Sequence, residues 1–138
     1  MLAGFNAPVA LIRLIEGGTF SPDCDSSRIE EIFRESDSYR FDLYDRSQIV
    51  RESCRFREGA RSDGETRSLF VRPGLGIDPE STLLIGDLGA DMPIALDYRI
   101  DLQRPRVLYL GVGGWIEVAE NFDSFCNLIL AVPGETFK

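Results

Sequence analysis

The sequence predicts an α+β domain with a mainly antiparallel sheet of about four to five strands and helices packed on one face. Three observations support this class. The second half holds four short apolar segments whose connections are too short for a helix, so neighbouring strands must pair antiparallel. Stretches with helical periodicity precede and follow these segments. The length of 138 residues fits a single domain over residues 1–138.

The stretch NAPVALIRLIEGG, residues 6–18, predicts the first helix. Asn6 is expected to cap this helix, and Pro8 suits its first turn. Gly17 and Gly18 are expected to form the turn that ends it. The apolar side chains that share the face expected to be buried are Val9, Ile12 and Ile15, with Leu11 adjacent.

A strand and a surface helix are expected in the middle of the chain. In YRFDLYD, residues 39–45, apolar and polar side chains alternate, which is typical of a strand with one buried face. The segment DRSQIVRESCRFREGAR, residues 45–61, has few strongly apolar positions, so we expect a helix that lies on the surface. Asp45 or Ser47 can cap that helix, and a loop is expected over 62–68.

Four strands of a meander are predicted for the second half: TLLIG (82–86), PIALDY (93–98), RVLYLG (106–111) and WIEVAE (115–120). Gly86 and Gly89 lie in the first turn, and one of them is expected to adopt a positive φ because the turn is short. Gly113 and Gly114 are expected to form a hairpin turn. A phosphate-binding loop is rejected for GVGG (111–114), because a strand and not a helix follows it.

The stretch NFDSFCNLILAV, residues 121–132, predicts a closing helix. Asn121 is expected to cap it. Its buried stripe is expected to comprise Phe122, Phe125, Leu128 and Ile129. Cys126 lies among these apolar residues and is therefore expected in the core.

The composition excludes several catalytic chemistries. The chain contains no histidine, which removes Ser-His and Cys-His nucleophile pairs and His-ligated zinc. Its one lysine is the last residue, Lys138, so neither a Schiff base nor a P-loop lysine is expected. Cys24, Cys54 and Cys126 lack metal-ligand spacing and are expected to be reduced structural thiols. Enzymes that use only carboxylates, tyrosine or arginine remain open.

The charge distribution favours a basic protein partner. The formal net charge is −8, and residues 78–138 hold 10 of the 23 acidic side chains but 4 of the 15 basic ones. This excess argues against direct nucleic-acid binding, which needs basic surface. It suits attraction to a basic protein, while solubility is the alternative explanation of the same charge.

The apolar runs predict a cytoplasmic protein without membrane attachment. No run approaches the ~20 apolar residues of a membrane span. The first stretch, MLAGFNAPVALIRLIEGG, has no basic residue before its apolar part and no small-residue cleavage site, so it is a poor signal peptide. We expect the protein to be a monomer or a weak dimer.

The segment IGDLGAD, residues 85–91, admits two interpretations. It resembles the last motif of haloacid-dehalogenase-type phosphatases, in which Asp87 and Asp91 would hold Mg²⁺ and Asp23 would be the nucleophile. Against this, no hydrophobic strand precedes Asp23, no lysine is available for the intervening motif, and the segment leads into a strand at Pro93 instead of a helix. We therefore expect a strand-to-strand turn whose Asp side chains bond its own amides, with no catalytic residue and no metal.

The order of these motifs resembles the SUKH superfamily, which includes the Smi/Knr-like regulators of yeast cell-wall assembly. The resemblance is carried by PESTLLIGDLGADMPIALDYR (79–99), PRVLYLGVGGWIEVAENFDSFCNLIL (105–130), LIRLIEGG (11–18) and FDLYDRSQIV (41–50). It spans most of the chain and is strongest over 79–130. Glu16 stands where the family has Asn, a further helix usually precedes LIRLIEGG there, and the loop 58–68 has no clear counterpart.

The resemblance implies an α+β binding scaffold without a cofactor, and not an enzyme. Many bacterial members look like immunity proteins that bind and neutralise polymorphic toxins, often nucleases or deaminases. We therefore expect an immunity-type protein whose partner is a basic toxin domain, with an intracellular regulatory interaction module as the alternative. The residues expected to contact the partner are Glu16, Asp87, Asp91, Asp97 and Trp115, and a packing role is the alternative for Trp115.

Overall fold

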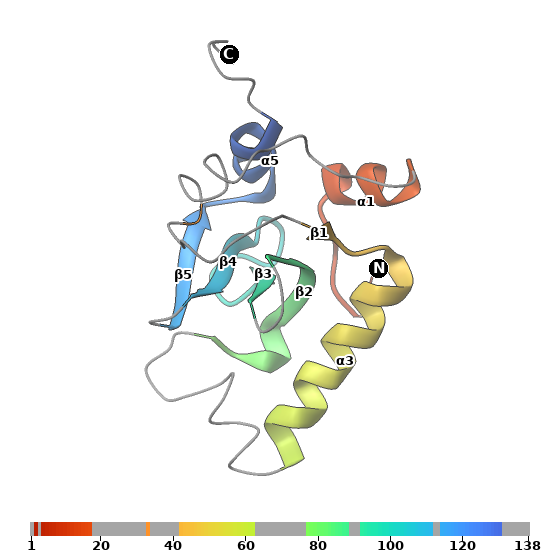
Figure 1. Ribbon diagram of the computed structural model, residues 1–138, viewed down its shortest axis with the longest axis vertical. Helices are drawn as coiled ribbons and strands as arrows, with labels where there is room; N and C mark the ends of the chain where they lie inside the picture. The colour runs from red at the N-terminus through yellow and green to blue at the C-terminus, as the bar shows by residue number, and fades with distance from the viewer. Residues whose placement is uncertain are drawn as a thin grey trace.

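The computed structural model describes three helices, a short 3-10 turn and five strands (Figure 1). The helices are α1 (Val9–Glu16), α3 (Arg46–Ser62) and α5 (Phe122–Leu130), and the 3-10 turn is η1 (Pro79–Ser81). The strands are β1 (Asp42–Leu43), β2 (Thr82–Asp87), β3 (Pro93–Asp97), β4 (Arg106–Gly111) and β5 (Gly114–Ala119). The residues described are 2, 4–17, 33, 42–62, 77–88, 92–111 and 114–130, without the side chains of 59–62 and 130.

The five strands form one antiparallel sheet in the order β1-β2-β3-β4-β5. Across its middle, Leu84 of β2 lies opposite Ala95 of β3, which in turn lies opposite Leu108 of β4. The predicted α+β class with an antiparallel sheet is confirmed, and β2 to β5 begin and end within one residue of the predicted bounds. Of the strand predicted over 39–45, the structure shows β1, Asp42–Leu43, and residues 39–41 lie outside the described part.

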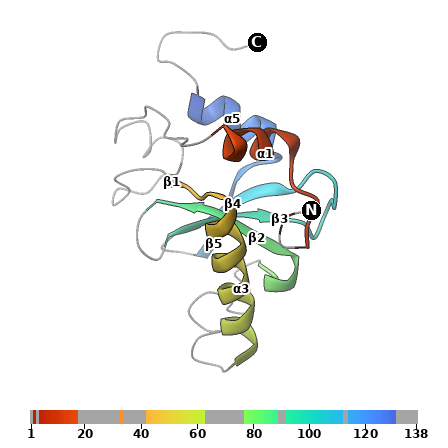
Figure 2. The same cartoon turned by 90° about the vertical axis from the view of Figure 1, so that its right-hand side faces the viewer.

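Helices α1 and α5 cover one face of the sheet, as Figure 2 shows. Strand alternation places Leu83 and Ile85 on this face and Leu84 on the other. The side chains buried in this main core are Leu2, Leu11, Phe33, Ile49, Leu83, Ile85, Leu88, Ile94, Leu96, Tyr98, Val107, Tyr109, Ala119, Phe122, Phe125 and Ile129. Each large apolar side chain among them stabilises the fold by roughly 1.5–3 kcal/mol through burial.

Helix α3 lies across the edge of the sheet, so the expectation that the helices lie on one face holds for α1 and α5 and only in part for α3. Ile49 in the first turns of α3 belongs to the main core, whereas Phe56 packs on the opposite face against Leu84. The helix thus crosses the edge of β2. At that edge the backbone N–H of Leu84 donates to the buried Oγ of Ser53 at 3.0 Å, which replaces a missing strand partner.

Side-chain caps start two of the helices. Asp45 accepts from the backbone N–H of Gln48 at 2.8 Å, and Gln48 Oε1 accepts from the N–H of Asp45 at 3.0 Å, which is a reciprocal capping box. Asn121 accepts from the N–H of Ser124 at 2.9 Å. Both caps confirm predictions. Asn6, in contrast, is not the cap of α1. That position is occupied by Pro8, which makes no side-chain cap bond.

Burial corrects part of the predicted helix faces. In α1, Leu11 is the fully buried residue, whereas Val9 is among the most exposed apolar side chains. Val9 is the first residue of α1. In α5, Phe122, Phe125 and Ile129 are buried as predicted, while Leu128 is exposed. Among the described helices, none is long and apolar enough to cross a membrane.

Gly86 is required by a close backbone contact and not by a positive φ. A Cβ atom built on Gly86 would lie 2.3 Å from the carbonyl oxygen of Asp42 in β1, beside an irregularity in the β2–β3 register. The described glycines with positive φ are Gly4 at 88° and Gly114 at 120°. The predicted positive φ is therefore wrong for Gly86, and Gly89 lies outside the described residues. Gly114 agrees with the predicted hairpin turn after β4.

Candidate functional site

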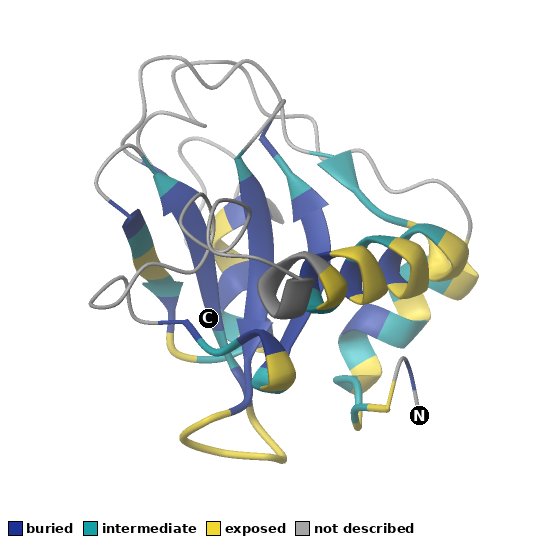
Figure 3. Ribbon diagram, turned by 90° about the horizontal axis from the view of Figure 1, so that it is seen from below, coloured by how far each residue is buried: buried dark blue, intermediate teal, exposed yellow. Residues whose placement is uncertain are grey.

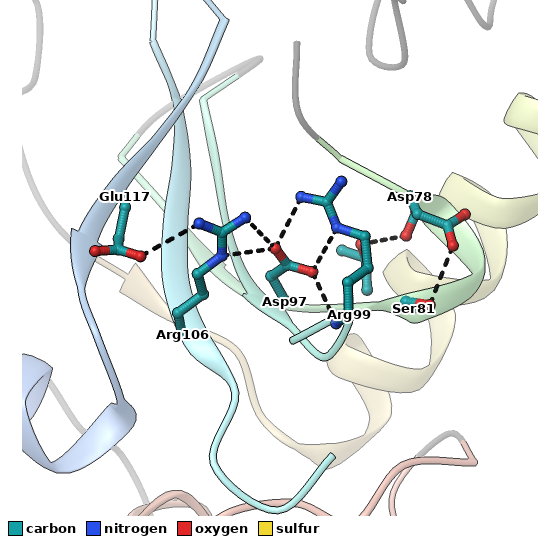
Figure 4. Close-up of polar contacts among 7 residues, drawn as sticks. Asp78, Ser81, Asp97, Arg99, Arg106 and Glu117 are labelled. Atoms are coloured by element: carbon teal, nitrogen blue, oxygen red, sulfur yellow. Dashed lines mark hydrogen bonds and ion pairs between the residues drawn. The ribbon is translucent and has the colours of Figure 1, made fainter. Parts of the chain in front are cut away.

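Asp97, at the end of β3, is a buried and multiply bonded polar residue. Its side chain is fully buried, and its two carboxylate oxygens accept from two arginines (Figure 4). Arg99 donates through Nε to Oδ1 and through Nη2 to Oδ2, both at 2.9 Å, and its backbone N–H reaches Oδ1 at 3.1 Å. Arg106 donates to Oδ2 through Nε at 2.8 Å, and its Nη2 forms an ion pair with the same oxygen at 2.8 Å. A buried carboxylate is thereby fully compensated.

The register of the sheet explains this cluster. Asp97 and Arg106 lie directly opposite each other on β3 and β4, so their side chains emerge from the same side of the sheet. Arg106 also reaches Oε1 of Glu117 on β5 at 3.3 Å. The cluster therefore ties three adjacent strands together at one end of the sheet.

Electrostatics keep Asp97 ionised. Burial by itself would raise the pKa of Asp97, but hydrogen bonds from the side chain and backbone of Arg99, and from the side chain of Arg106, outweigh burial and lower the pKa below its usual value. The hydrogen bond to Asp97 is correspondingly the main reason that the pKa of Arg99 is raised. The group is thus a permanent ion cluster at neutral pH, with no proton to exchange.

The loop between β3 and β4, residues 98–105, projects from the same end of the sheet. It is the yellow loop that extends beyond the buried strands in Figure 3. Asp101 closes its tip by accepting from the backbone N–H groups of Gln103 at 2.8 Å and Arg104 at 3.1 Å. Together with the contacts of Arg99 to Asp97, this turn fixes the loop at its base and at its tip.

The N-terminal segment, residues 4–8 before α1, contacts the loop from the side, and the two lie together in Figure 2. Asn6 Nδ2 donates to Oε1 of Gln103 at 2.9 Å, and the hydroxyl of Tyr98 donates to the carbonyl of Asn6 at 3.2 Å. The ring of Phe5 stacks on Tyr98 with centroids 4.6 Å apart and an interplanar angle of 26°. Arg57 of α3 lies 5.1 Å from the centroid of the Phe5 ring. The segment is therefore anchored on both sides.

The most exposed apolar side chains lie on the loop and at the start of α1. Among the described residues, the three most exposed large apolar side chains are Ile100 at 76%, Leu102 at 68% and Val9 at 66%, and the next, Ile116, is at 42%. Ile100 and Leu102 belong to the loop, and Val9 follows the N-terminal segment. Scattered exposed apolar residues are ordinary on protein surfaces, but two on one ordered loop, with a third where the segment bonded to that loop enters α1, are typical of a binding surface.

An open pocket of about 340 Å³ lies beside the loop. Its lining residues are Ile100, Asp101, Arg104, Arg106, Glu117, Glu120 and Asn121. Three carboxylates thus meet two arginines there, and the charge of Arg106 is already balanced by Asp97 and Glu117. The pocket joins the loop to the start of α5, where Asp123 adds another exposed carboxylate.

The structure separates the residues predicted to contact a partner. Asp97 is buried in the ion cluster, so it cannot contact a partner directly. Asp87 ends β2 and accepts from the hydroxyl of Tyr44 at 2.9 Å. Burial, followed by this hydrogen bond and the charge of Asp87, raises the pKa of Tyr44. Glu16 forms an exposed ion pair with Arg46 at 3.7 Å.

Trp115 is half-buried at the start of β5, where its ring packs edge-on against Phe56 at 6.1 Å. The contact supports the packing role over that of an exposed anchor. Gly17 follows α1 as predicted. The remaining predicted site and turn residues lie outside the described part of the chain: Gly18, Gly89, Asp91 and Gly113.

The sequence interpretation missed the β3–β4 loop as a candidate site. Its signal is the segment RIDLQR, residues 99–104, in which Ile100 and Leu102 alternate with charged or polar residues although they lie between two strands. Within the described residues, no group of three or more acidic or cysteine side chains could hold a metal ion. Comparison of the chain with protein-family models, with curated proteins and with solved structures finds no match.

Proposed function

We propose that this chain is a non-enzymatic protein-binding domain, and specifically an immunity protein that binds and neutralises a toxin domain of the nuclease or deaminase class. The observation that carries the proposal is that, at one end of the sheet, the charged group is buried and the apolar side chains are exposed. The buried ionised group, Asp97, serves the fold, while the apolar side chains of Ile100 and Leu102 are held out in solvent by a firmly bonded loop. A rigid loop that exposes apolar side chains is suited to binding another protein.

The phosphatase interpretation receives less support from the same geometry. Asp87 is engaged with Tyr44 at the end of β2, and the chain continues into β3, whereas the phosphatase motif continues into a helix. The segment therefore favours a connection between two strands of the meander. Gly86 in this segment is explained by its close approach to Asp42 and needs no ligand to account for it.

The net charge of −8 supports a basic partner. Toxin nucleases need basic surface to bind phosphates, so an acidic binder is complementary to them. The SUKH resemblance of residues 79–130 supports the immunity role in particular. A cytoplasmic regulatory interaction module, monomeric or weakly dimeric, would use the same surface and is the second candidate.

Co-expression tests the proposal. The reading frame adjacent to this chain in its genome is expressed from an inducible promoter, with and without the chain. Growth should be arrested without the chain and restored with it, and the two proteins should co-purify in a fixed ratio. A complex without protection would favour the regulatory module. If the chain neither protects cells nor forms a complex, both forms of the proposal are rejected. A catalytically inactive toxin is the control for expression load.

A further inference from the structure

We infer that Val9, Ile100 and Leu102, together with the pocket beside them, form the docking face for a basic protein segment in which an apolar side chain lies next to cationic ones. This inference rests on the proposed function and identifies the surface and the partner chemistry. This docking face comprises the three apolar residues and the pocket lined by Asp101, Arg104, Arg106, Glu117, Glu120 and Asn121.

The apolar part of the docking face explains where affinity would come from. The most exposed large apolar side chains of the described residues are Ile100 at 76%, Leu102 at 68% and Val9 at 66%. The Asn6–Gln103 hydrogen bond joins the loop to the segment that enters α1. Burying such side chains against a partner removes apolar surface from water, which is the main favourable term in protein association.

Pre-organisation lowers the cost of binding at this place. The loop is fixed at its base by Asp97 and at its tip by Asp101, and Gln103 is held by Asn6. Backbone and side chains that are ordered before binding lose little entropy when the partner docks. The buried ion cluster therefore acts on the partner indirectly, by positioning Ile100 and Leu102.

Charge decides which partner fits. Among the charged groups that line the pocket, Arg106 already forms ion pairs with Asp97 and Glu117. The other charged lining residues are two carboxylates, Asp101 and Glu120, and one arginine, Arg104, so acidic charge is in excess. Asp123 at the start of α5 adds to the negative side. A second copy of this chain would itself carry a net charge of −8, and the repulsion between two acidic chains opposes such a contact. Arginine or lysine side chains of a partner are attracted to the same surface.

The test uses two tetrapeptides with blocked ends as probes, one of alternating leucine and arginine and one of alternating leucine and glutamate. Each is titrated into the full 15N-labelled chain, and backbone amide shifts are followed by NMR. The basic peptide should give saturable shifts confined to Val9 and to residues 99–106 and 117–121. In the Ile100→Ser/Leu102→Ser double variant its dissociation constant should rise about tenfold or more. Both positions are exposed, so the variant keeps the fold.

Val50→Ser is the matched control, because Val50 is an exposed apolar residue on α3 that neither belongs to the docking face nor lines its pocket. It should leave peptide binding unchanged. The inference is overturned by equal binding of the acidic peptide, by shifts that map elsewhere, or by the absence of saturable shifts. Shifts of the same amides with protein concentration alone would assign the face to a second copy of the chain and also overturn it.

Failure of the inference and failure of the proposed function are distinguishable. Protection from the toxin that persists in the double variant would reject the docking face and leave the immunity role intact. Binding of the basic peptide at the docking face by a chain that does not protect cells would reject the immunity role and leave the face intact.

Discussion

Oδ2 of Asp97 accepts from Nε of Arg106 at 2.8 Å and forms an ion pair with Nη2 at 2.8 Å, across a directly opposed pair of β3 and β4. The bond fixes the point at which the β3–β4 loop leaves the sheet. Because Asp97 is fully buried, its charge is tolerated only through its arginine partners. The exposed apolar side chains of Ile100 and Leu102 thus depend on a buried carboxylate that no partner can touch.

Replacing Asp97 by Asn should destabilise the fold by about 3 kcal/mol at neutral pH, since removing one member of a buried ion pair leaves the other partly uncompensated. Urea denaturation followed by circular dichroism measures the loss. Glu120→Gln is the control, because Glu120 is exposed and its change should stay within about 0.5 kcal/mol. An Asp97→Asn variant as stable as the control would contradict the role assigned to the cluster.

The stabilisation by Asp97 should disappear in acid. Its pKa is lowered in the folded protein, so the unfolded chain binds the proton more readily. The stabilisation of the fold by ionised Asp97 is complete above the pKa of Asp in the unfolded chain, about 3.9. It is lost as pH falls through the lower pKa that Asp97 has in the folded protein. The difference in unfolding free energy between wild type and Asp97→Asn should therefore be constant from pH 7 to about pH 5 and shrink below pH 4. A gap that widens in acid is the opposite result.

Gly86→Ala should destabilise the protein by about 1–3 kcal/mol, because its methyl group would lie 2.3 Å from the Asp42 carbonyl and β1 would have to move. Gly17→Ala is the matched control. Gly17 has a right-handed backbone with φ −74°, and the nearest atom to an added Cβ is the Arg13 carbonyl oxygen at 3.1 Å. Gly17→Ala should lower the free energy of unfolding by less than about 1 kcal/mol. Thermal melts that shift equally in the two variants would refute the steric explanation.

The two described cysteines should differ in reactivity. Burial, with a smaller effect from the charge of Asp123, raises the pKa of Cys126 to about 11, whereas Cys54 is exposed on α3. At pH 8 the thiolate fraction of Cys126 is on the order of 0.1%, so it should react slowly. In a Cys24→Ser background, Ellman's reagent should label one thiol quickly and the second only after unfolding. Fast labelling of both thiols in the native chain would be incompatible with the packing of α5.

Much of the fold could be predicted because its signals are local. The four segments of β2 to β5 are short, apolar and separated by turn residues, so pairing order follows from connection length alone. The Asp45 and Asn121 caps are likewise local, since each bonds a backbone N–H three residues ahead. Local patterns also identified Phe122, Phe125 and Ile129 as core residues of α5, although Leu128, predicted by the same spacing, is exposed.

The site could not be predicted in the same way, because it depends on register and packing. Asp97 looks like any acidic residue at the end of a strand until the register places Arg106 opposite it. The position of α3 across the β2 edge depends on the buried Ser53 and on Phe56 facing a second, smaller cluster. Gly86 was recognised as special, but the cause is the approach of β1, which is remote in sequence.

Surface plasmon resonance between this chain and the toxin domain from the adjacent reading frame tests partner binding most directly. Between ~50 and ~500 mM salt the association rate should fall steeply, since exposed charges are screened over that range. Glu120→Gln/Asp123→Asn should slow association, and Ile100→Ser/Leu102→Ser should speed dissociation, while Glu58→Gln on α3 should change neither. The absence of saturable binding at every salt concentration would contradict the protein-binding role, and an association rate that is flat with salt would contradict an acidic docking face.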